Sequence, residues 1–156
     1  MRKWVSVGVV ALAFAVFVGV LALLVIRLQR PAVGPVEIVW DREPCTQCRM
    51  LIGDRAFAAQ IQTQDGRILN FDDPGCLLKY EVERAPAVRA IYFHKWKGEG
   101  WLTLDEVAFV PVPHSPMGYD LGAVEEGTPG SISLEAARSR VLRLAPRAEM
   151  GPHVEP

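Results

Sequence analysis

The stretch AFAAQIQTQDGRILNFDDPGCLLKYEVER, residues 56–84, decides the fold of this chain. Two short runs, Ala56–Gln64 and Arg67–Phe71, flank the dipeptide Asp65-Gly66, which is a strong local signal for a β-hairpin. The segment Asp72-Asp73-Pro74-Gly75 then predicts the start of a helix, because aspartate can cap a helix and proline is tolerated at its first position. A hairpin followed at once by a helix favours a mixed architecture.

Further elements are expected on both sides of this stretch. Pro86 ends the helix, and serine residues can cap a last helix near the C-terminus. Because strands and helices are mixed along the chain, we expect one α+β domain of antiparallel strands packed with two or three helices. The other expected elements are strands at Val36–Trp40, Val88–Trp96 and Asp120–Glu125, the apolar run Val107–Val112, and a helix from Ser131 or Ser133 to Leu144 with Leu134, Ala137, Val141 and Leu144 inside.

The N-terminal region predicts a membrane anchor. Residues Trp4–Ile26 run for 23 positions without a charge, and a helix of that length covers about 34 Å, against a hydrocarbon core of about 30 Å. The run exceeds a signal-peptide core and ends without a small-residue cleavage site. We therefore expect an uncleaved transmembrane helix over 4–26, a linker over 27–35, a folded domain over 36–147 and a tail over 148–156.

The charges suggest an orientation and exclude one class of partner. Arg2, Lys3 and the terminal amine favour a cytoplasmic N-terminus, which predicts a single-pass protein of the cytoplasmic membrane with its domain facing the periplasm or the cell exterior. Residues 31–156 carry 13 of the 17 basic side chains and all 18 acidic ones, a net charge of −5. Without a basic stripe, nucleic acid is not an expected partner.

The densest cluster of reactive side chains is Cys45-Thr46-Gln47-Cys48-Arg49-Met50. Two thiols three positions apart can converge on one ion when the backbone turns between them. Thiolate together with thioether is the ligand set that favours Cu(I) over harder ions. The cysteine pair by itself leaves zinc, copper and a redox disulfide open.

Other cysteine, histidine and methionine residues have a structural and a functional interpretation. Cys76 lies on the apolar face of the predicted helix, where a buried core residue is the simpler interpretation and a third sulfur near Cys48 the alternative. His94 in an apolar strand is expected to be packed. His114 lies three residues before Met117 in a proline-stiffened loop, which suits either a ligand-presenting segment or an ordinary surface loop.

Several of these pieces occur in an order that resembles the NosL family, accessory proteins of nitrous oxide reductase. The resemblance covers about residues 41–145. No enzyme motif such as a nucleophile elbow or P-loop is present beside it. The pieces are Cys45-x-x-Cys48-Arg49-Met50, Ala58-Ala59-Gln60-Ile61, Asp65-Gly66, Phe71 to Cys76, Tyr92-Phe93-His94, Trp101 and Pro116-Met117-Gly118.

The resemblance implies a Cu(I) metallochaperone, not an enzyme, outside the cytoplasmic membrane. It would deliver copper for assembly of the copper–sulfide centre of nitrous oxide reductase, or for a related cupro-enzyme. The family's ligand positions correspond here to Cys48 and Met117, and Cys45, Met50 and His114 are the candidates for a third ligand. Where the family motif has glycine after the second cysteine, this chain has an arginine, which makes the loop less able to turn.

Two other hypotheses use the same cysteines. A thiol–disulfide oxidoreductase acting through Cys45 and Cys48 predicts that the pair starts a helix inside a βαβ unit. A structural zinc domain predicts four converging ligands, namely Cys45, Cys48, Cys76 and a histidine.

Overall fold

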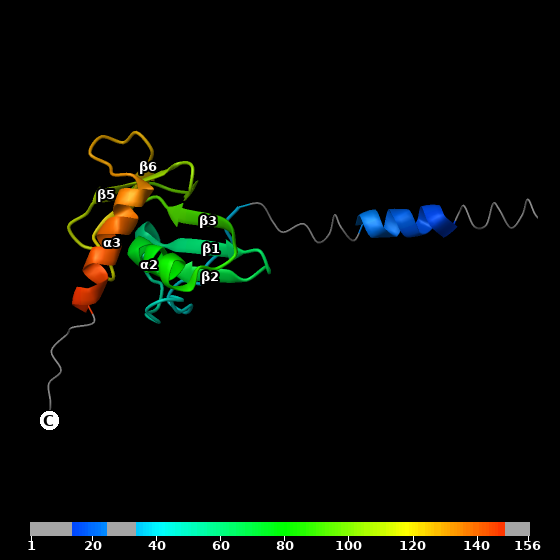
Figure 1. Ribbon diagram of the computed structural model, residues 1–156, viewed down its shortest axis with the longest axis horizontal. Helices are drawn as coiled ribbons and strands as arrows, with labels where there is room; N and C mark the ends of the chain where they lie inside the picture. The colour runs from blue at the N-terminus through cyan, green and yellow to red at the C-terminus, as the bar shows by residue number, and fades with distance from the viewer. Residues whose placement is uncertain (1–13, 25–33, 149–156) are drawn as a thin grey trace, which may run out of the picture. The chain divides into compact units, whose positions relative to one another are not determined.

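The computed structural model describes residues 14–24 and 34–148 of the chain. The chain divides into two compact units, Met1–Gly34 and Pro35–Pro156. In the first unit residues 14–24 are helical (Figure 1). Within the described ranges no helix is long and apolar enough to cross a membrane. The rest of the predicted anchor 4–26, most of the linker 27–35 and most of the tail 148–156 lie outside those ranges.

The second unit has the expected α+β architecture with antiparallel strands (Figure 1). A four-stranded sheet has the order β2-β1-β3-β4, and a separate two-stranded sheet pairs β5 with β6. Every pairing in both sheets is antiparallel. The strands are β1 (Ala59–Thr63), β2 (Ile68–Phe71), β3 (Val88–His94), β4 (Trp101–Thr103), β5 (Val107–Pro111) and β6 (Leu121–Glu125).

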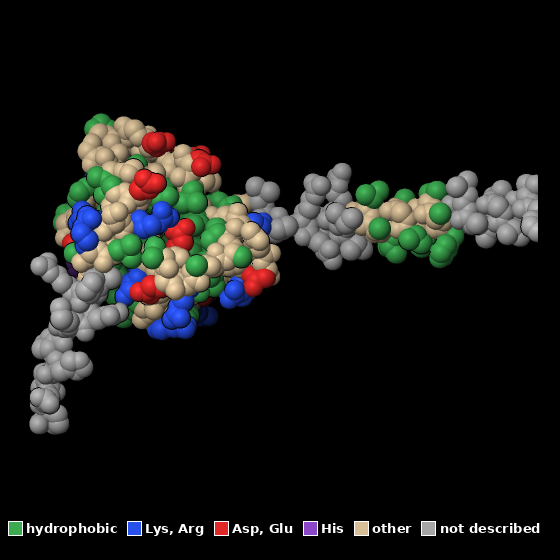
Figure 2. Space-filling model, in the orientation of Figure 1, with side chains coloured by type: hydrophobic (Ala, Val, Ile, Leu, Met, Phe, Trp, Pro, Cys, Tyr) green, Lys and Arg blue, Asp and Glu red, His purple; other side chains and the backbone are tan. Residues whose placement is uncertain are grey.

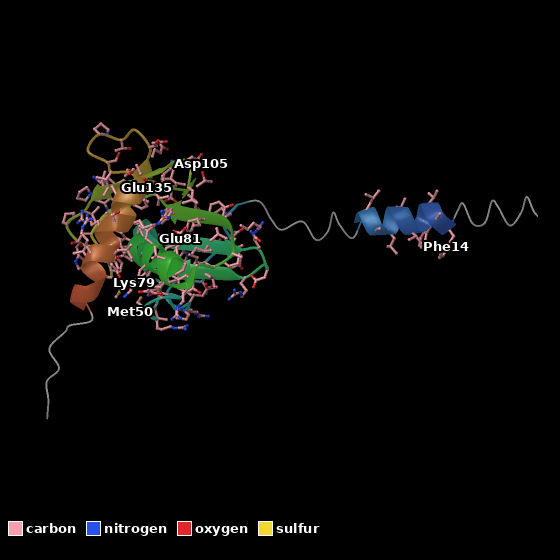
Figure 3. The ribbon with its side chains drawn as sticks, viewed as in Figure 1. Phe14, Met50, Lys79, Glu81, Asp105 and Glu135 are labelled. Carbon is pink, nitrogen blue, oxygen red and sulfur yellow. The ribbon has the colours of Figure 1, made fainter. Side chains whose placement is uncertain are left out.

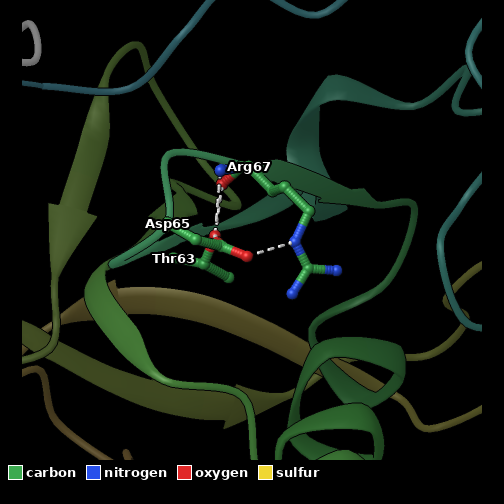
Figure 4. A network of polar contacts seen from close by, with 3 residues as sticks. All are labelled: Thr63, Asp65 and Arg67. Carbon is green, nitrogen blue, oxygen red and sulfur yellow. Dashed lines mark hydrogen bonds and ion pairs between the residues drawn. The ribbon is translucent and has the colours of Figure 1, made fainter.

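The predicted hairpin at Asp65-Gly66 is confirmed, and it joins β1 to β2. Gly66 has a φ of 86°, in the left-handed region that glycine adopts most easily. The Thr63 hydroxyl donates to the Asp65 carboxylate and accepts from the Arg67 N–H at 2.9 Å, and Arg67 Nε donates to Asp65 at 2.9 Å (Figure 4). Local side-chain bonds therefore reinforce the turn.

Both long helices of the domain are capped as expected. Helix α2 (Pro74–Arg84) starts at Asp73, whose carboxylate accepts from the Gly75 N–H at 2.8 Å. Helix α3 (Leu134–Ala148) follows Ser133, whose hydroxyl accepts from the Ala136 N–H at 3.3 Å. Helix α2 contacts β1, β2 and β6, while α3 contacts α2 and β5 (Figure 1). A short 3₁₀ turn, η1 (Arg55–Phe57), precedes β1.

One apolar core lies between the helices and the sheets. Phe93 of β3 and Phe109 of β5 meet edge to face with ring centroids 5.2 Å apart, which joins the two sheets. Ala137 and Val141 of the predicted inner stripe of α3 are fully buried. His94 is packed as expected, with its ring 5.3 Å from that of Trp101.

The predicted strand Val36–Trp40 is wrong, because this segment pairs with a side chain instead of a neighbouring backbone. The Val36 N–H donates to Gln60 Oε1 at 2.8 Å, and Gln60 Nε2 donates to the Val36 carbonyl at 2.9 Å.

On the face shown in Figure 2, lysine and arginine side chains are interspersed with acidic ones. This face therefore carries no continuous basic stripe.

Candidate metal centre

The segment Cys45–Met50 forms a tight turn that brings its two cysteines together. The Cys45 N–H donates to the Met50 carbonyl at 2.7 Å, and the Arg49 N–H donates to the Cys45 carbonyl at 3.0 Å. Arg49 has a φ of 69°, a left-handed conformation that costs a residue with a side chain about 1 kcal/mol or more. The turn therefore forms although Arg49, and not a glycine, occupies this position.

Hydrogen bonds fix this turn against β2 and α2. The Thr46 N–H donates to the Asn70 carbonyl at 2.8 Å. The Asn70 side chain in turn donates to Glu43 Oε2 at 2.6 Å. Gln47 Nε2 donates to Glu83 Oε2 of α2 at 2.9 Å. The cysteine turn is thus held at the end of β2, where α2 begins.

Four potential metal ligands converge at this point. One ligand atom each from Cys45, Cys48, Asp72 and Cys76 lies within 4.8 Å of all the others. Cys45, Asp72 and Cys76 are buried, and Cys48 is partly exposed. Two sulfurs bound to one tetrahedral ion at about 2.3 Å stand about 3.8 Å apart, so a small contraction is enough for binding. The cluster is compatible with a metal ion, and it does not by itself specify which.

A hydrogen bond between Cys45 and Cys76 favours the ionisation of Cys45. The Cys76 thiol donates a hydrogen bond to Cys45, which is the main reason that the pKa of Cys45 is lowered to about 7. Burial opposes this effect, while the N–H groups of Cys48 and Asp72 support it. The same hydrogen bond and burial raise the pKa of Cys76 far above its ordinary value. Of these two thiols, Cys45 is therefore the one that ionises more readily.

Cys48, like Cys76, has a thiol that resists ionisation. Burial, followed by its interactions with Cys45 and Asp72, raises its pKa to about 12, although the Met50 N–H opposes the shift. Its Sγ donates to Asp72 Oδ1 at 3.3 Å. The raised pKa values keep the protons on Cys48 and Cys76, in a cluster of four groups that become anionic when deprotonated. A cation that binds all three sulfurs must displace these protons.

Metal affinity is therefore expected to rise with pH. If all three sulfurs bind, each ion displaces two protons above pH 7, from Cys48 and Cys76, and three below it, because the pKa of Cys45 is about 7. Competition titrations at pH 6, 7 and 8 would measure the slope of log affinity against pH. A slope near zero would show that the thiols are not the ligands.

A second loop contacts the start of α2 through Asp73. Asp73 Oδ2 accepts from the Ser115 hydroxyl at 2.6 Å and from the Met117 N–H at 3.1 Å. Asp73 follows Asp72 directly in the chain, so the Met117 N–H binds the residue next to one member of the cluster. Burial raises the pKa of Asp73, while its hydrogen bonds oppose the rise. The fold thus brings the Cys-x-x-Cys turn and the Pro-Met-Gly loop to one end of α2.

The structure brings together some of the predicted site residues. Cys45 and Cys48 belong to the cluster. Met50 is 58% exposed and lies at the edge of the domain (Figure 3). Met117 is 36% exposed. His114 is exposed and lies outside the cluster, which contains no histidine of the described chain.

Sequence reasoning missed Asp72, which was explained by helix capping. For Cys76 it favoured a buried core residue and gave a third sulfur near Cys48 as the alternative. The odd number of cysteines was one signal for Cys76, since a leftover thiol needs a purpose. For Asp72 the only signal was its position four residues before a cysteine, because the capping role belongs to Asp73 alone.

Comparison of the chain with models of protein families, with curated proteins and with solved structures gives no match.

Proposed function

We propose that this domain is a Cu(I) metallochaperone, which holds copper through the thiolates of Cys45, Cys48 and Cys76 and passes it to a cupro-enzyme. The acceptor is nitrous oxide reductase or a related enzyme, in keeping with the NosL resemblance. The apolar run at residues 4–26 supports attachment to the cytoplasmic membrane with the domain outside. Copper is the cargo of this protein, and no catalytic step is involved.

One observation carries the proposal, namely the convergence of three sulfurs from segments far apart in the sequence. Thiolate is the ligand that most favours Cu(I), and three thiolates can surround it without further donors. The wild-type domain purified under reductant is therefore expected to retain Cu(I) in competition with a chromophoric chelator. Failure to compete with even a weak chelator would rule the proposal out.

The unequal exposure of the three sulfurs favours transfer over permanent storage. Cys45 is 0% exposed and Cys76 is 1% exposed, whereas Cys48 is partly exposed. An acceptor's ligand can therefore reach the ion on the Cys48 side while the two buried thiolates still hold it. Met50, two residues after Cys48, is exposed and adds a soft donor at the surface beside the cysteine turn.

A structural zinc site is the second candidate, because Asp72 supplies a fourth donor. Its carboxylate lies within the cluster, is 2% exposed and accepts from the Cys48 thiol at 3.3 Å. Three sulfurs and one oxygen complete the four ligands that structural zinc requires. The oxygen is the wrong partner for Cu(I), so Asp72 distinguishes the two metals.

Replacing Asp72 with asparagine is expected to leave Cu(I) affinity nearly unchanged. The same substitution should lower Zn²⁺ affinity by at least about tenfold, because a carboxylate ligand is lost. Both affinities can be measured by chelator competition, with Asp65→Asn on the exposed hairpin turn as the matched control. A large loss of Cu(I) affinity in Asp72→Asn alone would show that Asp72 contributes to Cu(I) binding and would contradict this prediction.

The redox hypothesis receives little support from the local fold. It predicts a Cys-x-x-Cys pair at the start of a helix inside a βαβ unit. Cys45 and Cys48 instead lie in a loop, and the sheets described here pair only antiparallel strands.

A further inference from the structure

A cavity of about 390 Å³ lies at one end of the four-stranded sheet, and none of the four residues of the cysteine cluster lines it. It is lined by His94, the last residue of β3, and by Trp101, the first residue of β4, which are partners in the antiparallel pairing of these strands. Residues 35–38, Trp40 and Arg55 line it as well. The proposed copper site uses none of these side chains.

One ring nitrogen of His94 is free to bind a ligand, although the side chain is only 8% exposed. Nδ1 lies 3.0 Å from the Lys95 carbonyl oxygen. Because a carbonyl only accepts, Nδ1 carries the proton, and in the neutral ring Nε2 keeps its lone pair. Within the described part of the chain no hydrogen bond reaches Nε2, and no buried side-chain nitrogen there lacks a partner. Nε2 therefore reaches the surface of the cavity as an acceptor.

Two carboxylates add further acceptors to the cavity. Glu37 and Glu99 line it and are exposed. Among the described residues, neither carboxylate has an ion pair or a hydrogen bond. With Arg55 as the one cation of the lining and a neutral His94, the cavity carries a net charge of −1. These groups favour a cationic ligand that donates hydrogen bonds.

The two tryptophans favour an organic cation over a metal ion. Trp40 and Trp101 are both half-buried. Cζ of Arg55 lies 4.9 Å from the centroid of the Trp40 ring, so this ring already holds a guanidinium group. Within the described ranges, the acidic and histidine side chains of the cavity are not among the groups that converge on a metal ion.

We propose that this cavity binds an organic cation with N–H donors, namely a guanidinium or a primary ammonium group. The indole rings contact its face, the two carboxylates balance its charge, and His94 Nε2 accepts one of its hydrogen bonds. In the free protein Arg55 covers the Trp40 ring and competes with the ligand for it. This site is separate from the cysteine cluster, so the proposal does not depend on the proposed copper function.

Three small probes test which chemistry the cavity recognises. n-Butylguanidinium has the charge and the N–H donors, n-butyltrimethylammonium has the charge alone, and butyrate has the opposite charge. In the full-length protein, n-butylguanidinium should shift the indole N–H signals of Trp40 and Trp101 in NMR spectra and leave that of Trp96 unchanged. It should bind about tenfold more tightly than n-butyltrimethylammonium, because the latter donates no hydrogen bond, and butyrate should not bind. Equal binding of the three probes would overturn the proposal.

Two substitutions have expected effects of opposite sign. Arg55→Ala should strengthen the binding of n-butylguanidinium by about threefold, because it removes a like charge and uncovers the Trp40 ring. Glu99→Gln should weaken binding by about threefold. Glu126→Gln, which changes an exposed carboxylate outside this cavity, is the matched control and should have no effect. Weaker binding in Arg55→Ala, or equal losses in the two glutamate variants, would contradict the proposed site.

The ¹⁵N signal of His94 Nε2 reports the acceptor without any substitution, so this readout does not depend on a variant that folds. n-Butylguanidinium should shift this signal, since a hydrogen bond forms at the lone pair. A further probe, N-acetyl-arginine amide, identifies the source of the cation. Binding as tight as that of n-butylguanidinium assigns the cation to an arginine side chain of a protein, and weaker binding assigns it to a free small molecule. An unshifted Nε2 signal at saturating n-butylguanidinium would overturn the proposal.

Discussion

Replacing Cys76 with alanine is expected to lower Cu(I) affinity by about a hundredfold or more, because it removes one of three thiolates from a site with no other sulfur in its buried part. The Cys76 side chain is 1% exposed and lies in the cluster with Cys45 and Cys48. The measurement is competition with a chromophoric Cu(I) chelator under reductant. The variant should fold, since losing one sulfur atom leaves only a small cavity.

Leu78→Met is the matched control for this result. Leu78 is on the same helix and is 0% exposed, but it lies outside the cluster. The change should cost less than about 1.5 kcal/mol and leave Cu(I) affinity unchanged. If a folded Cys76→Ala protein instead kept the wild-type Cu(I) affinity, Cys76 would be a core residue without a role in binding. The pair Cys48 and Met117 would then be the better assignment of the ligands.

Replacing Gly75 with alanine is expected to destabilise the domain by about 3 kcal/mol, because the new methyl group would overlap a buried ring. An ideal Cβ at Gly75 would lie 2.1 Å from Cγ of Tyr119. The ring is 7% exposed and has little room to move. Since Gly75 lies next to Cys76, a shift of the helix backbone that relieved the overlap would also move a residue of the cluster. Thermal unfolding and Cu(I) competition would measure the two effects.

Two further variants isolate the steric cause. Gly66→Ala introduces the same methyl group at a turn with a φ of 86° and no atom within 4 Å, so it should cost only the backbone strain of about 1 kcal/mol. Combining Gly75→Ala with Tyr119→Ala should cost less than the sum of the single changes. Additive costs would show that helix geometry, and not the ring, excludes a side chain at Gly75.

The parts of the fold that depend on local chemistry could be predicted from the sequence. Asp65-Gly66 forms its hairpin through contacts among residues 63–67, and Asp73 caps α2 through a residue two positions away. Val36 shows where prediction from local sequence patterns fails. Its extended backbone pairs with the buried side chain of Gln60, and no local pattern reveals a partner of that kind.

The site could be predicted only where its ligands are neighbours in the sequence. Cys45 and Cys48 are recognisable by their spacing, but Cys76 joins them only because α2 begins at the end of β2, beside the cysteine turn. Helix capping seemed a sufficient explanation for both Asp72 and Asp73. In the fold Asp73 takes that role and Asp72 faces Cys48 instead. Which of the two adjacent aspartates caps the helix and which contacts a cysteine depends on the tertiary contacts around them.

If the cluster carries copper as proposed, its assembly from a loop, the end of a strand and a helix links metal binding to the stability of the folded protein. The unfolded chain cannot present the three sulfurs together, so an ion held by all three stabilises only the folded state. At a free ion concentration about a thousand times the dissociation constant, this adds about 4 kcal/mol to the free energy of unfolding. A protein that has delivered its ion loses that protection and opens more often to proteases. Copper supply would thereby set the abundance of the protein as well as its occupancy.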